Sequence, residues 1–270
     1  MNRGNGHPGV HFLLSLIDQD DAAAVRRRLG IGEPEELAVE HAVQWLDRLP
    51  RPRSVLLWML QEDDPATNRV LFNHLGTPGT IKRDILRGVP FGGTGGRLHV
   101  LVHGQAPEIP VGPRGVVGDL REARTMKTAR AAARVVGGDD WTDVAEADRT
   151  EPLPGYARWA LTERIDCPAT VRAQFGSHAK FTHRLRRAGI VEPAEYVEVT
   201  RPPQDMLAVL RLGEVLFPRR VREAAAVLAP LVHSELGVDP DAWAVLAQLL
   251  PRFAGTVPEL VRTSGAVARV

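Results

Sequence analysis

The sequence predicts a mainly α-helical protein: an irregular helical-repeat (α-solenoid-like) array with a short, partly extended, non-repeat insertion in its middle. Of its 270 residues, 44% are hydrophobic but only 5% are aromatic, so Leu, Val and Ala must build most of the core. Such side chains favour packing of helix on helix. Apolar residues also recur at helical spacing along most of the chain. Finally, residues 13–26 align without gaps on residues 56–69.

The N-terminal third predicts helices over residues 10–19, 22–29 and 37–46, and then a pair over 54–88. Asp20 or Asp21 is placed to cap the second helix, and Gly30 to end it. Pro34 lies where the first turn of the third helix would start, and the Pro-rich stretch 49–53 ends that helix. Asp63, Asp64 and Pro65 form the turn within the pair.

The gapless alignment has an offset of about 43 residues, within the range of two-helix solenoid repeats. A third copy covers residues 159–175, and a weaker fourth covers 239–260. An acid before a helix accepts hydrogen bonds from the first free amides, and Pro at the first helical position loses none. Independent helices that share these caps are the alternative explanation.

The middle of the chain has another character. A Gly-rich stretch, 91–96, precedes a strand-like run, Arg97–His103, and helices are predicted over 119–136 and 139–148. Helices are predicted again from residue 156 to the end of the chain. We therefore expect three parts: N-terminal helical repeats (1–88), a Gly- and Pro-rich insertion or hinge (89–154) and C-terminal helical repeats (155–270).

Composition limits the classes of function. The net charge of +1 gives no overall attraction to nucleic acid or to an anionic membrane, and only three of the 34 basic residues are lysines. The single Cys167 excludes an internal disulfide framework and a multi-thiolate zinc site. No apolar run reaches the roughly 18 residues of a membrane span. The apolar run nearest the N-terminus is also too short for the hydrophobic region of a signal peptide. We expect a cytoplasmic protein with no membrane partner.

No motif assigns a catalytic residue. The glycines of 92–96 precede the strand-like run instead of following a strand, so they predict a flexible loop and not a phosphate site. His99 and His103 have no evident third ligand, so neither a metal nor another cofactor is expected. Cys167 is expected to be a buried, inert residue, and the paired acids are explained as helix caps.

Residues 156–190 resemble a helix-turn-helix. A recognition helix would place its first polar side chains on base edges and its arginines on phosphates. The corresponding nucleic-acid contacts would be Lys180, Thr182, Arg184, Arg186 and Arg187.

The acid-Pro-Ala-Thr-x-Arg pattern at Asp64–Arg69, with its partial echo at Pro168–Arg172, resembles the HEAT-like and leucine-rich-repeat-variant classes of helical repeat proteins. The arginine skew and segments such as 242–260 are similar to those of actinobacterial helical proteins. The resemblance implies stacked helix pairs with a surface for a partner.

We therefore expect a non-enzymatic binding or scaffold module whose partner is another protein. The repeat register suggests Arg69, His74, Arg172 and His178 as contacts, whereas Trp58 and Trp159 are expected in the core. A DNA-binding regulator acting through 156–190 is the alternative. An enzyme with a pocket between the two helical halves, beside Arg97–His103, is the second alternative.

Overall fold

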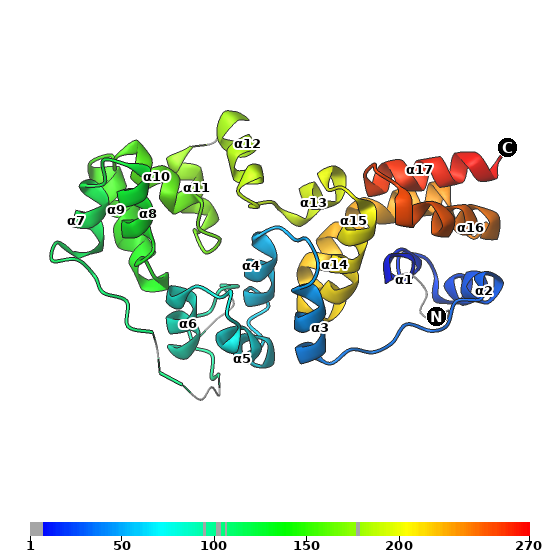
Figure 1. The fold of residues 1–270 in the computed structure, drawn as a ribbon, viewed down its shortest axis with the longest axis horizontal. Helices are drawn as coiled ribbons and strands as arrows, with labels where there is room; N and C mark the ends of the chain where they lie inside the picture. Colours follow the sequence, from blue (N-terminus) through cyan, green and yellow to red (C-terminus); the bar gives the residue numbers. More distant parts are fainter. Residues whose placement is uncertain (1–7, 94–95, 101–103, 106, 177–178) are drawn as a thin grey trace. The chain divides into compact units, whose positions relative to one another are not determined.

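The computed structural model describes residues 8–93, 96–100, 104–105, 107–176 and 179–270, with the backbone alone at 179 and 180 (Figure 1). Helices are the only regular elements among these residues, so the predicted mainly α-helical class is confirmed. None of the helices in this described part combines the length and apolar character that a bilayer crossing requires.

The predicted strand is wrong for residues 97–100, which form no strand; residues 101–103 lie outside the described part. A strand needs a neighbouring strand to satisfy its backbone. Here the Leu98 amide donates instead to the carbonyl oxygen of Gly88, at 2.8 Å, in the turn that ends a helix.

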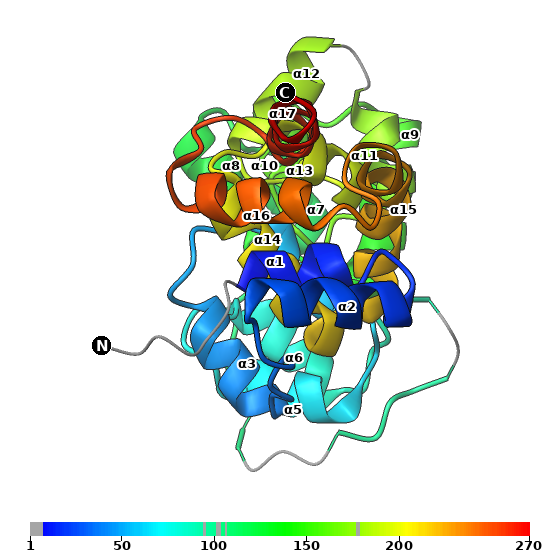
Figure 2. The same ribbon diagram turned by 90° about the vertical axis from the view of Figure 1, so that its right-hand side faces the viewer.

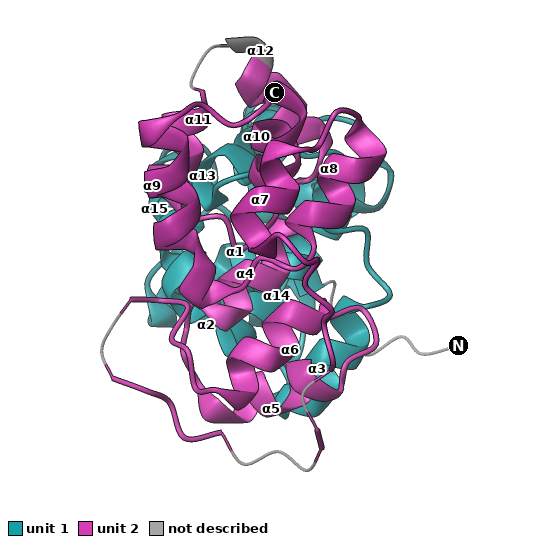
Figure 3. Cartoon of the chain, turned by 90° about the vertical axis from the view of Figure 1, so that its left-hand side faces the viewer, with its two compact units in different colours: residues 1–51, 191–270 teal, residues 52–190 magenta. Residues whose placement is uncertain are grey.

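The chain forms two compact units, which are coloured separately in Figure 3. Unit 1 contains both chain ends, residues 1–51 and 191–270, and unit 2 is the continuous segment 52–190. The three-part division above rests on composition and stays a prediction.

Unit 1 is an assembly of helices around α14. Its helices are α1 (Pro8–Leu14), α2 (Gln19–Leu29), α3 (Val39–Leu46), α13 (Pro193–Val199), α14 (Pro203–Leu216), α15 (Pro218–Glu235), α16 (Pro240–Leu249) and α17 (Val257–Ala268). Helices α1 and α3 pack on α14, α15 packs on α13, α14 and α17, and α16 packs on α2 and α17. Figure 2 shows α1 and α2 close to α16, although about 200 residues separate them in the sequence.

Glycines permit two of these close approaches. A Cβ atom on Gly9 of α1 would lie 2.8 Å from the Cβ of Leu207 on α14. A Cβ on Gly265 of α17 would lie 2.3 Å from the carbonyl oxygen of Glu235 at the end of α15. Both distances are shorter than van der Waals contact, so the tight pairing of these helices depends on the missing side chain.

Unit 2 is built from shorter helices. They are α4 (Ser54–Leu60), α5 (Pro65–Asn73), α6 (Gly79–Leu86), α7 (Gly115–Arg121), α8 (Met126–Ala133), α9 (Trp141–Thr150), α10 (Gly155–Thr162), α11 (Ala169–Phe175) and α12 (Ala179–Arg187), with a 3-10 turn, η1, at Gly138–Asp140. Helix α10 packs on α8 and α11, and α9 packs on α7 and α11. Leu120, Ala129, Val144 and Leu161 lie in the shared apolar core of α7 to α11.

The predicted repeat copies fall on the helix pairs α1–α2, α4–α5, α10–α11 and α16–α17, but their caps differ. Asp64 caps α5 by accepting a hydrogen bond from the Thr67 amide at 2.7 Å. In α2 the cap is Asp18, not the predicted Asp20 or Asp21. At α11 the cap position is Pro168, and no side chain caps that helix. The four segments therefore have no common capping pattern, and the repeat stays a prediction.

Two predicted helix limits need correction. The helix expected over 119–136 is two helices, α7 and α8, because Thr125 and Thr128 form a capping box that starts α8. The helix expected from Pro34 begins only at Val39. The segment between α2 and α3 contains no helix, so Pro34 does not lie in the first turn of α3.

Candidate functional site

Helix α12 is held against α10 by one aromatic and one cationic contact. The rings of Phe181 and Trp159 meet edge to face, with centroids 5.6 Å apart and planes at 82°. The guanidinium of Arg184 lies 5.7 Å from the centroid of the same indole. Phe181 is buried, so these contacts fix one face of α12 and leave the other to solvent.

The solvent face of α12 is basic. Its exposed side chains are Thr182, His183, Arg184, Arg186 and Arg187, and the helix contains no acidic residue. The predicted nucleic-acid contacts Thr182, Arg184, Arg186 and Arg187 are therefore all exposed on one short helix. The backbone of Lys180 belongs to α12, but its side chain lies outside the described part.

A groove of about 480 Å³ lies beside this helix, between α8, α10 and α12. It is lined by Met126, Arg130, Gly155, Tyr156, Trp159 and Arg184. Tyr156 is 50% exposed, so half of its surface is open to solvent. Arg130 is anchored by Glu163 through bonds of 3.0 and 3.1 Å, and these bonds raise the pKa of the Arg130 guanidinium. The groove thus combines an exposed aromatic ring with fixed cations.

The residues predicted to contact a protein partner occupy different settings. Arg69 is exposed on α5. His74 ends α5, and its Nδ1 accepts a hydrogen bond of 3.1 Å from the Gly76 amide. Arg172, on α11, donates from Nη2 to the carbonyl oxygen of Arg164 at 2.9 Å. His178 lies outside the described residues. His74 and Arg172 are thus already used in local structure.

Trp58 is buried, with 1% of its surface exposed, and Trp159 is half-buried. Trp58 therefore belongs to the core, as expected. The same expectation for Trp159 is not met. Trp159 instead supports α12 and lines the groove described above.

The enzyme alternative relied on Arg97–His103. Arg97 and His99 are exposed, and His103 lies outside the described part. Cys167 is 3% exposed, and burial raises the pKa of its thiol to about 12, so it is protonated at neutral pH and poorly nucleophilic. Among the described residues, no group of three or more His, Cys, Asp or Glu side chains is arranged to hold a metal ion.

Asp63 and Asp64 have separate structural roles. Asp63 adopts a positive φ of 54°, and its carboxylate accepts bonds from the amides of Phe91, at 2.8 Å, and Gly92, at 3.0 Å. Asp63 therefore fixes the start of the Gly-rich loop, whereas Asp64 caps α5. A Cβ on Gly92 would lie 2.3 Å from the carbonyl oxygen of Gln61, so only glycine fits there.

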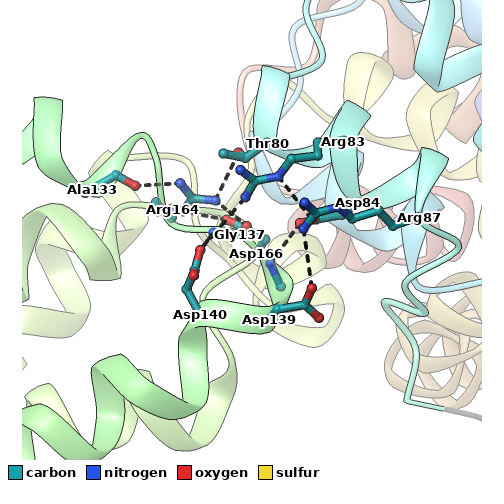
Figure 4. A network of polar contacts seen from close by, with 11 residues as sticks. Thr80, Arg83, Asp84, Arg87, Ala133, Gly137, Asp139, Asp140, Arg164 and Asp166 are labelled. Carbon is teal, nitrogen blue, oxygen red and sulfur yellow. Dashed lines mark hydrogen bonds and ion pairs between the residues drawn. The ribbon is translucent and has the colours of Figure 1, made fainter. Parts of the chain in front are cut away.

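A polar network connects α6 with η1 and with the turn after α10 (Figure 4). Asp84 of α6 is 1% exposed, and its Oδ2 accepts a bond of 2.9 Å from the Gly138 amide. Arg83 lies 3.9 Å from both Asp84 and Asp140. Burial raises the pKa of the Asp84 carboxyl, against the smaller opposing effects of the Gly138 amide and Arg83.

Asp148 of α9 is also buried, but its pKa is shifted in the opposite direction to that of Asp84. Arg158 contacts both of its oxygens, at 2.7 and 3.1 Å, and Gln174 and the Leu153 amide also donate to it. Burial alone would raise the pKa of Asp148, but these hydrogen bonds and the Arg158 charge lower the pKa below its ordinary value. Asp148 therefore links α9, α10 and α11 as a charged group.

Unit 1 holds a cavity of about 390 Å³ bounded by α1, α3, α14 and the segment between α2 and α3. Trp45 on its border is 53% exposed. His11 also lines it, and its buried Nδ1 has no hydrogen-bond partner in the described part of the chain. Burial, followed by the charges of Arg211 and Arg26, lowers the pKa of His11. Sequence inspection missed this cavity because its lining comes from distant segments.

Comparison with protein-family models, with curated proteins and with solved structures finds no match for this chain.

Proposed function

We propose that this protein is a non-enzymatic binding module, built from helix pairs of the helical-repeat kind, that engages nucleic acid through α12 and the groove beside it. The observation that carries the proposal is the exposed, acid-free basic face of α12, fixed on α10 by the Phe181–Trp159 contact. Gly176 directly follows α11, and glycine is common in the turn of a helix-turn-helix.

The groove adds a second kind of contact. Arginines neutralise phosphates, while an exposed aromatic ring such as Tyr156 can stack on an unpaired base. Arg130 and Arg184 line this groove together with the rings of Tyr156 and Trp159. A surface with both chemistries fits nucleic acid better than it fits an acidic protein, which would need no stacking platform.

A protein partner, the first expectation from the sequence, remains the second candidate. It is favoured by the turn between α5 and α6, where Leu75 is 98% exposed, next to His74 and six residues after Arg69. An exposed leucine at the tip of a helix pair is a side chain that a protein groove could bury.

The proposal is tested by fluorescence anisotropy with a labelled 20-base duplex and a labelled 20-base single strand, at two salt concentrations. We expect salt-sensitive binding, with an affinity that falls at least about tenfold between 50 and 200 mM salt. The variant R184Q/R186Q/R187Q should lose most of this affinity and show a shallower salt dependence.

The matched control is R27Q/R28Q/R222Q, which removes the same charge from exposed positions of unit 1. It should bind as the unaltered protein does. Equal losses in both variants would reduce the interaction to net charge and contradict a specific role for α12. No binding of either oligonucleotide at 50 mM salt would overturn the nucleic-acid proposal and favour the protein partner.

A further inference from the structure

A second cavity of unit 2, of about 470 Å³, is lined by four arginines from separate segments. They are Arg53 before α4, Arg130 and Arg134 of α8 and its end, and Arg164 after α10. We call this space the arginine cavity. Glu163 and Asp166 are the acids in its lining, so the charged side chains around it sum to +2.

The four arginines are not equivalent. Arg130 is paired with Glu163, and Arg164 with Asp166. Arg53 and Arg134 are exposed and have no carboxylate partner among the described residues. Two guanidinium groups that border one cavity without an acid leave its positive charge uncompensated, which favours an anion there.

Arg164 is preorganised. Its guanidinium donates to the Ala133 carbonyl oxygen at 2.6 Å and to Thr80 Oγ1 at 3.3 Å, and it lies 5.5 Å from the centroid of the Trp141 ring. Figure 4 shows Arg164 between Ala133, Thr80 and Asp166. Arg164 is therefore held in place before any ligand binds, and it needs little further ordering.

Helix α6 contributes partial positive charge of its own. It begins at Gly79, and its cap position, Pro78, supplies no side-chain hydrogen bond. Pro78, Gly79 and Thr80 line the cavity, so the first turn of α6 borders it. Free amides at the start of a helix favour negative charge, which adds to the effect of the arginines.

The remaining lining is apolar. Ile109, Ala133, Ala160 and Ile165 supply it together with Pro78. Inorganic phosphate alone would leave these side chains uncovered, whereas an organic group attached to the phosphate would bury them. The cavity volume lies within the range of small-molecule sites.

We infer that the arginine cavity binds a small organic phosphate monoester, whose phosphate meets Arg53, Arg134 and the start of α6 and whose organic group lies against Ile109 and Ile165. The monoester carries about two negative charges at neutral pH, which match the +2 of the lining. This site is separate from the proposed nucleic-acid contact, although Arg130 lines both spaces.

Isothermal titration calorimetry of the full chain with phenyl phosphate and with inorganic phosphate tests the inference. We expect saturable binding of phenyl phosphate, severalfold tighter than that of inorganic phosphate. The variant R53Q/R134Q should weaken phenyl phosphate binding at least about tenfold, because two charge-assisted contacts are removed. Both positions are exposed, and a thermal unfolding curve checks that the variant is folded.

The control R97Q/R124Q removes two exposed arginines of unit 2 that do not line the cavity, and it should bind phenyl phosphate normally. R184Q/R186Q/R187Q should also bind it normally, which separates this site from the nucleic-acid proposal. Loss of binding in either of these variants, equal affinity for the two phosphates, or no measurable binding would overturn the inference.

Discussion

The guanidinium of Arg184 lies over the indole of Trp159, so the basic helix α12 is attached to α10 by a side chain that belongs to its own charged face. The buried Phe181 meets the same indole in an edge-to-face contact. One indole therefore makes both of these contacts with α12, and its removal should release the helix without altering its charge.

The first prediction follows from this arrangement. Trp159→Ala should speed backbone hydrogen exchange across residues 179–187, because an aromatic pair and a cation–π contact are lost together, about 1–3 kcal/mol in sum. Mass-spectrometric hydrogen exchange measures this directly. Trp45→Ala removes an exposed indole of unit 1 and should leave these residues unchanged. Unaltered exchange in Trp159→Ala would show that other contacts hold α12.

A second prediction concerns Asp148. Asp148→Asn should lower the free energy of unfolding at pH 7 by about 2 kcal/mol, because the buried carboxylate loses charge-assisted hydrogen bonds and the partly exposed Arg158 loses its partner. The folded-state pKa of Asp148 lies below 3.8, so its contribution is present above that pH and is lost as the pH falls through the folded-state pKa.

Urea denaturation at a series of pH values measures this effect. The difference between the two proteins should shrink in acid, below pH 3.8. Asp143→Asn changes an exposed acid of the same helix and should have little effect at any pH. A deficit that stays constant into acid would mean that packing, and not charge, explains the loss.

The third prediction is a gain in the free energy of unfolding, where the second is a loss. Burial raises the pKa of Asp84. Its ionisation therefore lowers the free energy of unfolding as the pH rises from 3.8 through the folded-state pKa. Asp84→Asn keeps an oxygen that can accept from the Gly138 amide and removes the buried charge. We expect unfolding at pH 7 to require about 1 kcal/mol more, and the gain to vanish in acid.

Thermal unfolding at pH 7 and at pH 3 checks this third prediction. The comparison with Asp148→Asn is its internal control, since both changes replace a buried aspartate by asparagine. A comparable loss of stability in both variants would show that the nearby Arg83 compensates the Asp84 charge fully.

Local signals in the sequence predicted part of the fold. Apolar spacing identified the helices around 54–88, and Asp64 with Pro65 predicted the start of α5 correctly, because a cap is made by residues next to each other in the chain. The same logic misplaced the cap of α2 by two or three residues, since several aspartates compete there. It also missed the Thr125 box, whose two threonines are a weaker signal than an acid.

Sites made by distant segments were not predictable in this way. The basic residues of α12 were identified because they lie close together on one predicted helix. The arginine cavity draws on Arg53, Arg130 and Arg164, which have no common spacing. Likewise, Asp84 and Gly138 are 54 residues apart, and nothing local distinguishes that aspartate from an exposed one.

The topology of the two units also bears on the order in which the chain matures. Near one end of unit 2, the Ser54 amide donates to the carbonyl oxygen of Gly189 near the other, at 3.0 Å, so this continuous segment closes on itself. During synthesis it has all its residues once position 190 has left the ribosome, and it can complete its core then. Helices α1 to α3 must wait for α14 and α16, which are made after unit 2. Unit 2 can thus become native while helices α1 to α3, which were translated before it, still lack their partners.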